Sequence, residues 1–102
     1  MSLTKKYLKS KPLCKVTFKL TAEEAGQANQ AVVLGDFNNW DRSEAEMKRN
    51  KKGDFSLTLD LPTEASFHYR YLLDGDKWEN DPEADAYERS PIGEHDNSVV
   101  RL

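Results

Sequence analysis

Hydrophobic and polar residues alternate with a period of two in several short stretches of the chain. Residues 13–21, 55–61 and 67–73 alternate in this way, whereas residues 31–34 form a continuous apolar run. A period of two places successive side chains on opposite faces of a strand, and a short apolar run fits a strand buried on both faces. Glycine, asparagine and aspartate separate the stretches, as is typical of turns. The pattern predicts short β-strands joined by turns.

The remaining stretches complete an antiparallel arrangement. Residues 45–49 fit a brief edge strand, and the Asp-Gly pair at 74–75 predicts a hairpin whose returning arm is 77–79. Residues 97–102 predict a final strand, while 81–93 contain two prolines and no clear period, which indicates a long surface excursion. Many short strands without a convincing helix are typical of an antiparallel β-sandwich.

The apolar positions of these strands are expected to face inward and build a single core. Cys14 lies on the same side of its strand, so it is expected to be a small buried hydrophobe rather than a reactive thiol. The predicted core consists of Val16, Phe18, Val33, Phe55, Leu57, Leu59, Phe67, Tyr69, Tyr71 and Val99.

Composition favours one soluble domain. The 102 residues are 37% hydrophobic and 32% charged, with a formal net charge of −3. This length buries a modest core without metal or disulfides, and a single cysteine forms neither an intramolecular disulfide nor a thiolate zinc cluster. The chain lacks both a signal-peptide pattern and an apolar run near the ~20 residues of a membrane span. A cytoplasmic protein without a membrane partner is expected.

Lysines dominate the first residues. Residues 1–11 are predicted to be a flexible basic leader, and residues 12–102 the domain. Deleting residues 1–10 is therefore expected to leave stability nearly unchanged. The leader contains one aromatic residue and no recognisable nucleic-acid motif, so nucleic acid is not expected as a partner.

Two tryptophans follow turns. Trp40 ends a polar corner that comes directly after the apolar run 32–34, and Trp78 lies just past the turn at 74–75. A tryptophan delivered by a turn either packs back on the core or shows a flat apolar face to solvent. The alternatives are thus a core cap for Trp40, a cross-strand partner for Trp78, or a joint ligand platform.

Catalysis and metal binding are weakly supported by the pattern. Acidic residues close together, such as Asp81 and Glu83, invite comparison with the paired carboxylates of glycosidases, but such pairs are common in an acidic stretch. His68 and His95 have no cysteine or neighbouring histidine that would complete a zinc site, and a calcium-loop pattern is missing. We expect a non-enzyme without a cofactor or a metal.

Taken in order, the motifs resemble the family 48 carbohydrate-binding modules, the early-set domains of isoamylases, glycogen-branching enzymes and the β subunit of AMP-activated protein kinase. The resemblance runs from about Leu13 to Leu102. It rests on VLGDFNNW at 33–40, YRYLLDG at 69–75, WENDP at 78–82 and NSVV at 97–100. It implies an immunoglobulin-like early-set β-sandwich.

The resemblance also implies a set of sugar-binding residues. In the glycogen-binding members two tryptophans stack on glucose rings, and a basic residue and an asparagine bond hydroxyl groups; these positions fall on Trp40, Trp78, Arg70 and Asn97. A pyranose offers an apolar C–H face and a rim of hydroxyls, which suits aromatic, guanidinium and amide groups. Two other interpretations stay open: Arg70 pairing with Asp60 or Asp81, and Asn97 bonding turn backbone.

The implied function is non-catalytic binding of an α-glucan such as glycogen, starch or a maltooligosaccharide. The alternative is an early-set docking domain with little sugar affinity, in a complex of glycogen metabolism or of a kinase. A glycogen-metabolism enzyme is a possible partner in either case. Retardation in a native gel that contains glycogen separates the two functions.

Overall fold

The computed structural model describes residues 3–91, 93 and 95–102. Within this part of the chain the alternating stretches are strands, and the polar corner forms one turn of 3-10 helix. The elements are β1 (Leu3–Tyr7), β2 (Leu13–Leu20), β3 (Ala31–Gly35), η1 (Asp36–Asn38), β4 (Lys48–Arg49), β5 (Phe55–Pro62), β6 (Ser66–Leu73), β7 (Lys77–Glu79), β8 (Ala86–Arg89) and β9 (Asp96–Arg101).

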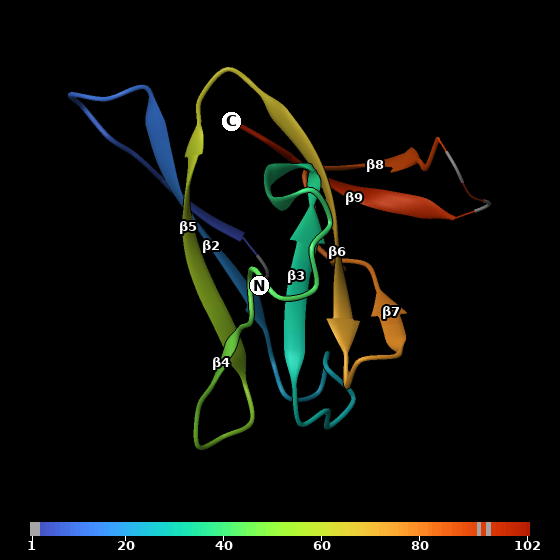
Figure 1. Cartoon of the computed structure of the whole chain (residues 1–102). Helices are drawn as coiled ribbons and strands as arrows, with labels where there is room; N and C mark the ends of the chain where they lie inside the picture. Colours follow the sequence, from blue (N-terminus) through green and yellow to red (C-terminus); the bar gives the residue numbers. More distant parts are fainter. Residues whose placement is uncertain (1–2, 92, 94) are drawn as a thin grey trace.

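The strands form two antiparallel sheets that pack face to face (Figure 1). One sheet has the order β1-β2-β5-β4, and the other has the order β3-β6-β9-β8, with β7 also paired to β6. Strands β9 and β7 pair with successive halves of β6, at residues 66–69 and 71–73. The predicted β-sandwich and the hairpin at 74–75 are confirmed.

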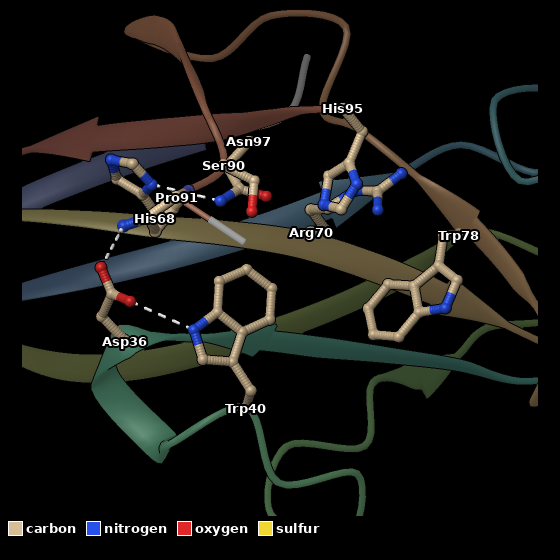
Figure 2. Close-up of a pocket in the computed structure, with 9 residues that line it drawn as sticks. All are labelled: Asp36, Trp40, His68, Arg70, Trp78, Ser90, Pro91, His95 and Asn97. Carbon is tan, nitrogen blue, oxygen red and sulfur yellow. Dashed lines mark hydrogen bonds between the residues drawn. The ribbon is translucent and has the colours of Figure 1, made fainter. Parts of the chain in front are cut away.

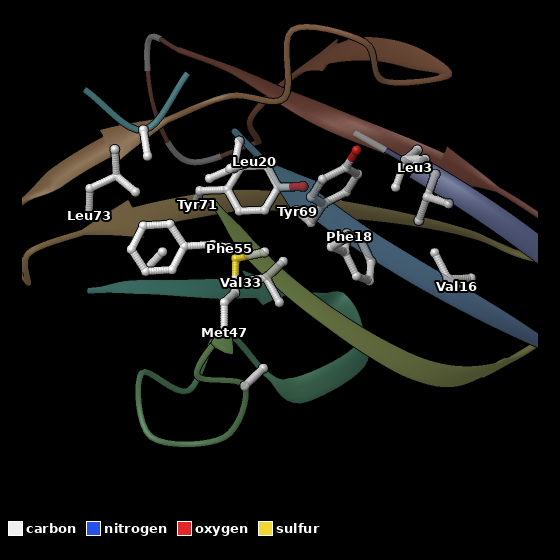
Figure 3. Close-up of a cluster of buried hydrophobic side chains, with 14 of the residues drawn as sticks. Leu3, Val16, Phe18, Leu20, Val33, Met47, Phe55, Tyr69, Tyr71 and Leu73 are labelled. Atoms are coloured by element: carbon white, nitrogen blue, oxygen red, sulfur yellow. The ribbon is translucent and has the colours of Figure 1, made fainter. Parts of the chain in front are cut away.

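The core lies between the sheets and is rich in aromatic residues (Figure 3). The ring of Phe18 lies 5.2 Å from that of Tyr69, and Tyr69 lies 5.9 Å from Tyr71, both pairs edge to face. Six predicted core residues are buried in one cluster, and three more pack against it while partly buried. The six are Val16, Phe18, Val33, Phe55, Tyr69 and Tyr71; the three are Leu57, Leu59 and Phe67.

Val99 departs from the predicted core. It is buried, but its cross-strand partner is His68, and its neighbour Val100 is the residue of β9 that joins the core cluster. Because successive side chains of a strand point to opposite faces, Val99 faces outward from the sandwich. Four consecutive buried residues in β9 hide the alternation that would have revealed this.

A carboxylate lies at the inner face of the five-stranded sheet. Asp81 is fully buried and accepts hydrogen bonds from the Tyr69 hydroxyl at 2.6 Å and the Tyr71 hydroxyl at 3.4 Å. The Asp81 backbone N–H donates to Ser98 Oγ at 2.8 Å, and its second carboxylate oxygen accepts from the Glu83 N–H. Burial, with the nearby charge of Asp81, raises the pKa of both tyrosines well above the ordinary value.

The predicted flexible leader is wrong for the residues that the structure describes. Leu3–Tyr7 form β1 and pair with β2 over their whole length. The Leu3 side chain is buried in the core, and Lys5 Nζ lies 2.6 Å from Asp85 Oδ2. A five-residue strand with a single buried side chain gives too weak an apolar period to be recognised among lysines. Met1 and Ser2 lie outside the described residues.

The predicted excursion at 81–93 contains strand β8, which pairs with β9. Three of its four residues are exposed, so periodicity could not reveal it. Ile92 of this stretch lies outside the described residues. The brief edge strand predicted at 45–49 is present as β4. Across the described part of the chain, helical residues nowhere form a segment long and apolar enough to cross a membrane.

Candidate functional site

The polar corner after β3 begins at Gly35, where only glycine fits. A Cβ atom there would lie 2.5 Å from the backbone oxygen of His68 on the neighbouring strand. The side chain of Asn38 then closes the turn, because its Oδ1 accepts from the Gly35 N–H and its Nδ2 donates to the Val33 carbonyl, both at 3.1 Å. The corner is therefore fixed against β3 and β6 before it reaches Trp40.

Trp40 adopts an uncommon backbone conformation. Asn39 and Trp40 are both left-handed, with φ of 55° and 56°, which costs a tryptophan on the order of 1 kcal/mol. The indole Nε1 donates to Asp36 Oδ1 at 3.1 Å, while Asp36 Oδ2 accepts from the His68 backbone N–H at 2.8 Å. These contacts hold the indole against the outer face of the five-stranded sheet.

Trp78 reaches the same face from β7. It is the cross-strand partner of Leu72, as one of the two interpretations expected. Both tryptophans are half-buried and pack on a small outer cluster formed by Val32, Leu34 and Leu72. This cluster is separate from the main core, so Trp40 does not cap that core.

The two indoles line one cavity of about 630 Å³ (Figure 2). Small-molecule sites ordinarily have volumes of about 300–1,000 Å³. All four residues expected to bind sugar lie here, contributed by the corner, β6, β7 and β9. The lining residues are Asp36, Trp40, His68, Arg70, Trp78, Ser90, Pro91, His95 and Asn97.

Figure 2 shows Arg70 on β6, on the side of the sheet where both indoles lie. Its Cζ atom is 5.4 Å from the centroid of the Trp78 ring, and that of Arg42 is 5.9 Å from the same ring. The Arg70 Nε atom is buried without a hydrogen-bond partner among the described residues. Burial lowers the pKa of Arg70, and the charge of Glu79 partly offsets this shift.

The two acidic partners considered for Arg70 lie elsewhere. Asp60 is on β5, in the other sheet, where its Oδ1 is 3.4 Å from Lys15 Nζ. Asp81 is fully buried and bonded to the inward-facing tyrosines. Arg70 points to the opposite face of the sheet, so neither ion pair forms.

Asn97 is buried at the edge of the cavity. Its Nδ2 lies 3.2 Å from His68 Nδ1, and its Oδ1 has no hydrogen-bond partner among the described residues. His68 Nε2 in turn lies 2.7 Å from Glu88 Oε1. The side chain of Asn97 thus contacts a neighbouring strand rather than turn backbone, with one acceptor left unmatched.

Several lining residues were not identified from sequence. The period of two already places His68 on the same face of β6 as Arg70, so this residue was recognisable in principle. Asp36, in the corner, could be recognised only as a turn former. Ser90, Pro91 and His95 come from the segment between β8 and β9. No pattern in the sequence predicts that this segment folds over the cavity.

The arrangement is an antiparallel β-sandwich that carries an aromatic cavity on one outer sheet face. The sequence was also compared with models of known protein families. The family model for the glycogen recognition site of AMP-activated protein kinase matches residues 17–100. The chain belongs to this family of carbohydrate-binding modules.

Proposed function

We propose that the chain is a non-catalytic module that binds glycogen or a related α-glucan in the cavity between Trp40 and Trp78. The single observation that carries the proposal is that both indoles, Arg70 and Asn97 line one cavity. Family membership supports glycogen as the ligand class. The proposal assigns stacking to the indoles and hydroxyl contacts to the two polar side chains.

The chemistry of the cavity suits a neutral sugar. Indole faces cover the apolar C–H side of a pyranose, and Arg70 offers N–H donors in a fixed fork to the ring hydroxyls. Asn97 Oδ1 and Arg70 Nε are buried and have no partner among the described residues, so both side chains retain hydrogen-bonding capacity for a hydroxyl-bearing ligand. A buried polar group that lacks a partner is costly, so a matching ligand is favoured.

Binding without chemistry fits the carboxylates at the site. Asp36 is the acidic residue among those described that line the cavity, and both of its oxygens already accept hydrogen bonds. Glycoside hydrolysis uses two carboxyl groups on either side of the bond to be cleaved. We therefore assign Asp36 to holding Trp40.

Affinity for each site is expected to be weak and nearly independent of salt. Hydroxyl contacts replace contacts with water, and each stacked ring adds about 1 kcal/mol beyond its buried area. A neutral ligand also releases no counterions, in contrast to a polyanion on a lysine surface.

Native electrophoresis through a gel containing glycogen tests the proposal. Wild type should be retarded, and Trp40→Ala and Trp78→Ala should each lose detectable retardation while melting close to wild type. The matched control is Tyr7→Ala, which removes an aromatic side chain that is 54% exposed on the other sheet. It should be retarded as wild type is.

Three results would contradict the proposal. Wild type that migrates unchanged would favour the docking-domain alternative, and release of sugar over time would favour catalysis. Retention of binding in both tryptophan variants would move the site elsewhere. Unfolding of either variant would assign that tryptophan to structure.

A further inference from the structure

His68 contacts two sides of the cavity, the corner that carries Trp40 and the strand that carries Asn97. Its backbone N–H donates to Asp36, which holds Trp40, and its ring contacts Asn97. Figure 2 shows this chain of contacts along one wall of the cavity. His68 therefore contacts both Asn97 and the residue that holds Trp40.

The contacts of the ring define its tautomer. Asn97 Nδ2 is an amide nitrogen that only donates, so His68 Nδ1 at 3.2 Å must accept and carries no proton. The ring proton is then on Nε2, from which it is donated to Glu88 Oε1 at 2.7 Å. The structure therefore corresponds to a neutral His68 held between a carboxylate and an amide.

This arrangement sets the orientation of the Asn97 amide. With Nδ2 directed at His68, Oδ1 points away from the ring and has no partner in the part of the chain that the structure describes. An amide rotated by half a turn would place Oδ1 against the unprotonated Nδ1, two acceptors facing each other, which is unfavourable. Neutral His68 thus leaves Oδ1, an acceptor, as the unpaired group of Asn97 among the described residues, and an acceptor suits the O–H donor of a sugar hydroxyl.

Protonation of His68 reverses this preference. A proton on Nδ1 would face the N–H groups of Asn97, and rotation of the amide would replace this donor-donor contact with a hydrogen bond to Oδ1. Nδ2, a donor, would then be the unpaired group of Asn97. Among the described residues, the charged or titratable groups on this side of the sheet are Glu88 on β8, Asp36 at the corner, Arg70 on the same face of β6, Arg101 on β9 and His95 in the cavity.

We propose that His68 is a positioning residue that fixes Asn97 as an acceptor, so that the site selects a hydroxyl donor and weakens when His68 is protonated. This inference rests on the proposed function, because it concerns the polarity of the same sugar site. The inference adds a role for His68, which does not stack on the sugar: through Asn97 it determines whether the site binds a hydroxyl group that donates a hydrogen bond.

Nuclear magnetic resonance of the free protein tests the positioning without any sugar. As pH is lowered from 8 to 5, the side-chain amide signals of Asn97 should change wherever the ring signals of His68 change, and only there. At pH 8 the long-range nitrogen spectrum should show the Nε2-protonated ring. In His68→Gln, which keeps an acceptor for Asn97 but does not titrate, the shift should vanish; in His95→Gln it should persist.

Retardation by glycogen at the same two pH values tests the effect on binding. Wild type should be retained several-fold more weakly at pH 5 than at pH 8, and His68→Gln should be retained equally at both. Asn97 signals that ignore the His68 titration would overturn the inference, as would equal retention of wild type at both pH values. Wild type that fails to bind at pH 8 would overturn the proposed function, while the amide signals would still decide the positioning.

Discussion

The two faces of β6 differ in whether their buried polar groups have hydrogen-bond partners. On the inner face, the hydroxyls of Tyr69 and Tyr71 both donate to Asp81. On the outer face, among the residues that the structure describes, Arg70 Nε and Asn97 Oδ1 are the buried side-chain polar atoms without a partner. The first face is complete within the protein, whereas the second has hydrogen-bonding capacity left over.

This difference separates stability from binding along a single strand. A matched buried network stabilises the fold, and removing one member leaves the others unpaired. An unmatched buried group is a cost to the free protein that a ligand relieves. Substitutions on the inner face should therefore change unfolding, and those on the outer face should change binding.

The largest expected effect is on the inner face. Tyr71→Ala removes a fully buried ring and its hydrogen bond to Asp81, so the free energy of unfolding should fall by about 3–5 kcal/mol. Urea denaturation followed by circular dichroism measures this loss. An unchanged midpoint would show that the inner face is not the stabilising one.

Alkaline pH should act on the same face. In an unfolded chain tyrosine loses its proton near pH 10, whereas burial raises the pKa of Tyr69 and Tyr71 in the folded protein. Above about pH 10 the folded state therefore binds more protons, and stability falls as pH rises. Each tyrosine should remove about 1.4 kcal/mol by pH 11.

Urea titrations at pH 8, 10 and 11 measure this loss. Tyr71→Phe should show a shallower fall than wild type, because one of the two groups no longer titrates. Equal slopes in both proteins would assign the alkaline effect to other groups.

A smaller loss is expected from removing β1, which covers the core from the other sheet. Deleting residues 1–10 exposes the core around Leu3, whose burial contributes about 2 kcal/mol. Leu3→Ala should reproduce much of the loss in urea denaturation, and Tyr7→Ala, at an exposed position, should not. If the deletion variant were as stable as wild type, the original prediction of a leader that does not contribute to stability would be correct.

Alternation was sufficient to predict most of the sandwich because one buried face imposes a period of two. It identified β2, β5 and β6 and most of the core. It failed at β1 and β8, where few side chains are buried, and at Val99, where four consecutive residues are buried. In each case the tertiary partner, rather than the local pattern, decides the structure.

For the site, sequence supplied the residues but not the relations between them. The motifs placed Trp40, Arg70, Trp78 and Asn97 on turns and strands that meet in one cavity. The contact between His68 and Asn97 depends on the pairing of β6 with β9, which periodicity does not specify. Their roles in sugar binding remain a proposal that the gel experiments address.

The smallest expected change in stability is on the outer face of β6, at Arg70. Arg70→Met keeps a flexible apolar stem but removes a partly desolvated charge whose Nε has no partner among the described residues. The free energy of unfolding should therefore stay within about 1 kcal/mol of wild type or rise slightly. Retardation by glycogen should fall, because the N–H donors are lost. Arg70→Lys, which retains a cation and N–H donors, should bind better than Arg70→Met at equal stability. If Arg70→Met instead destabilised the protein as strongly as Tyr71→Ala, the outer face would serve the fold as the inner face does, and the unmatched atoms would carry no information about a ligand.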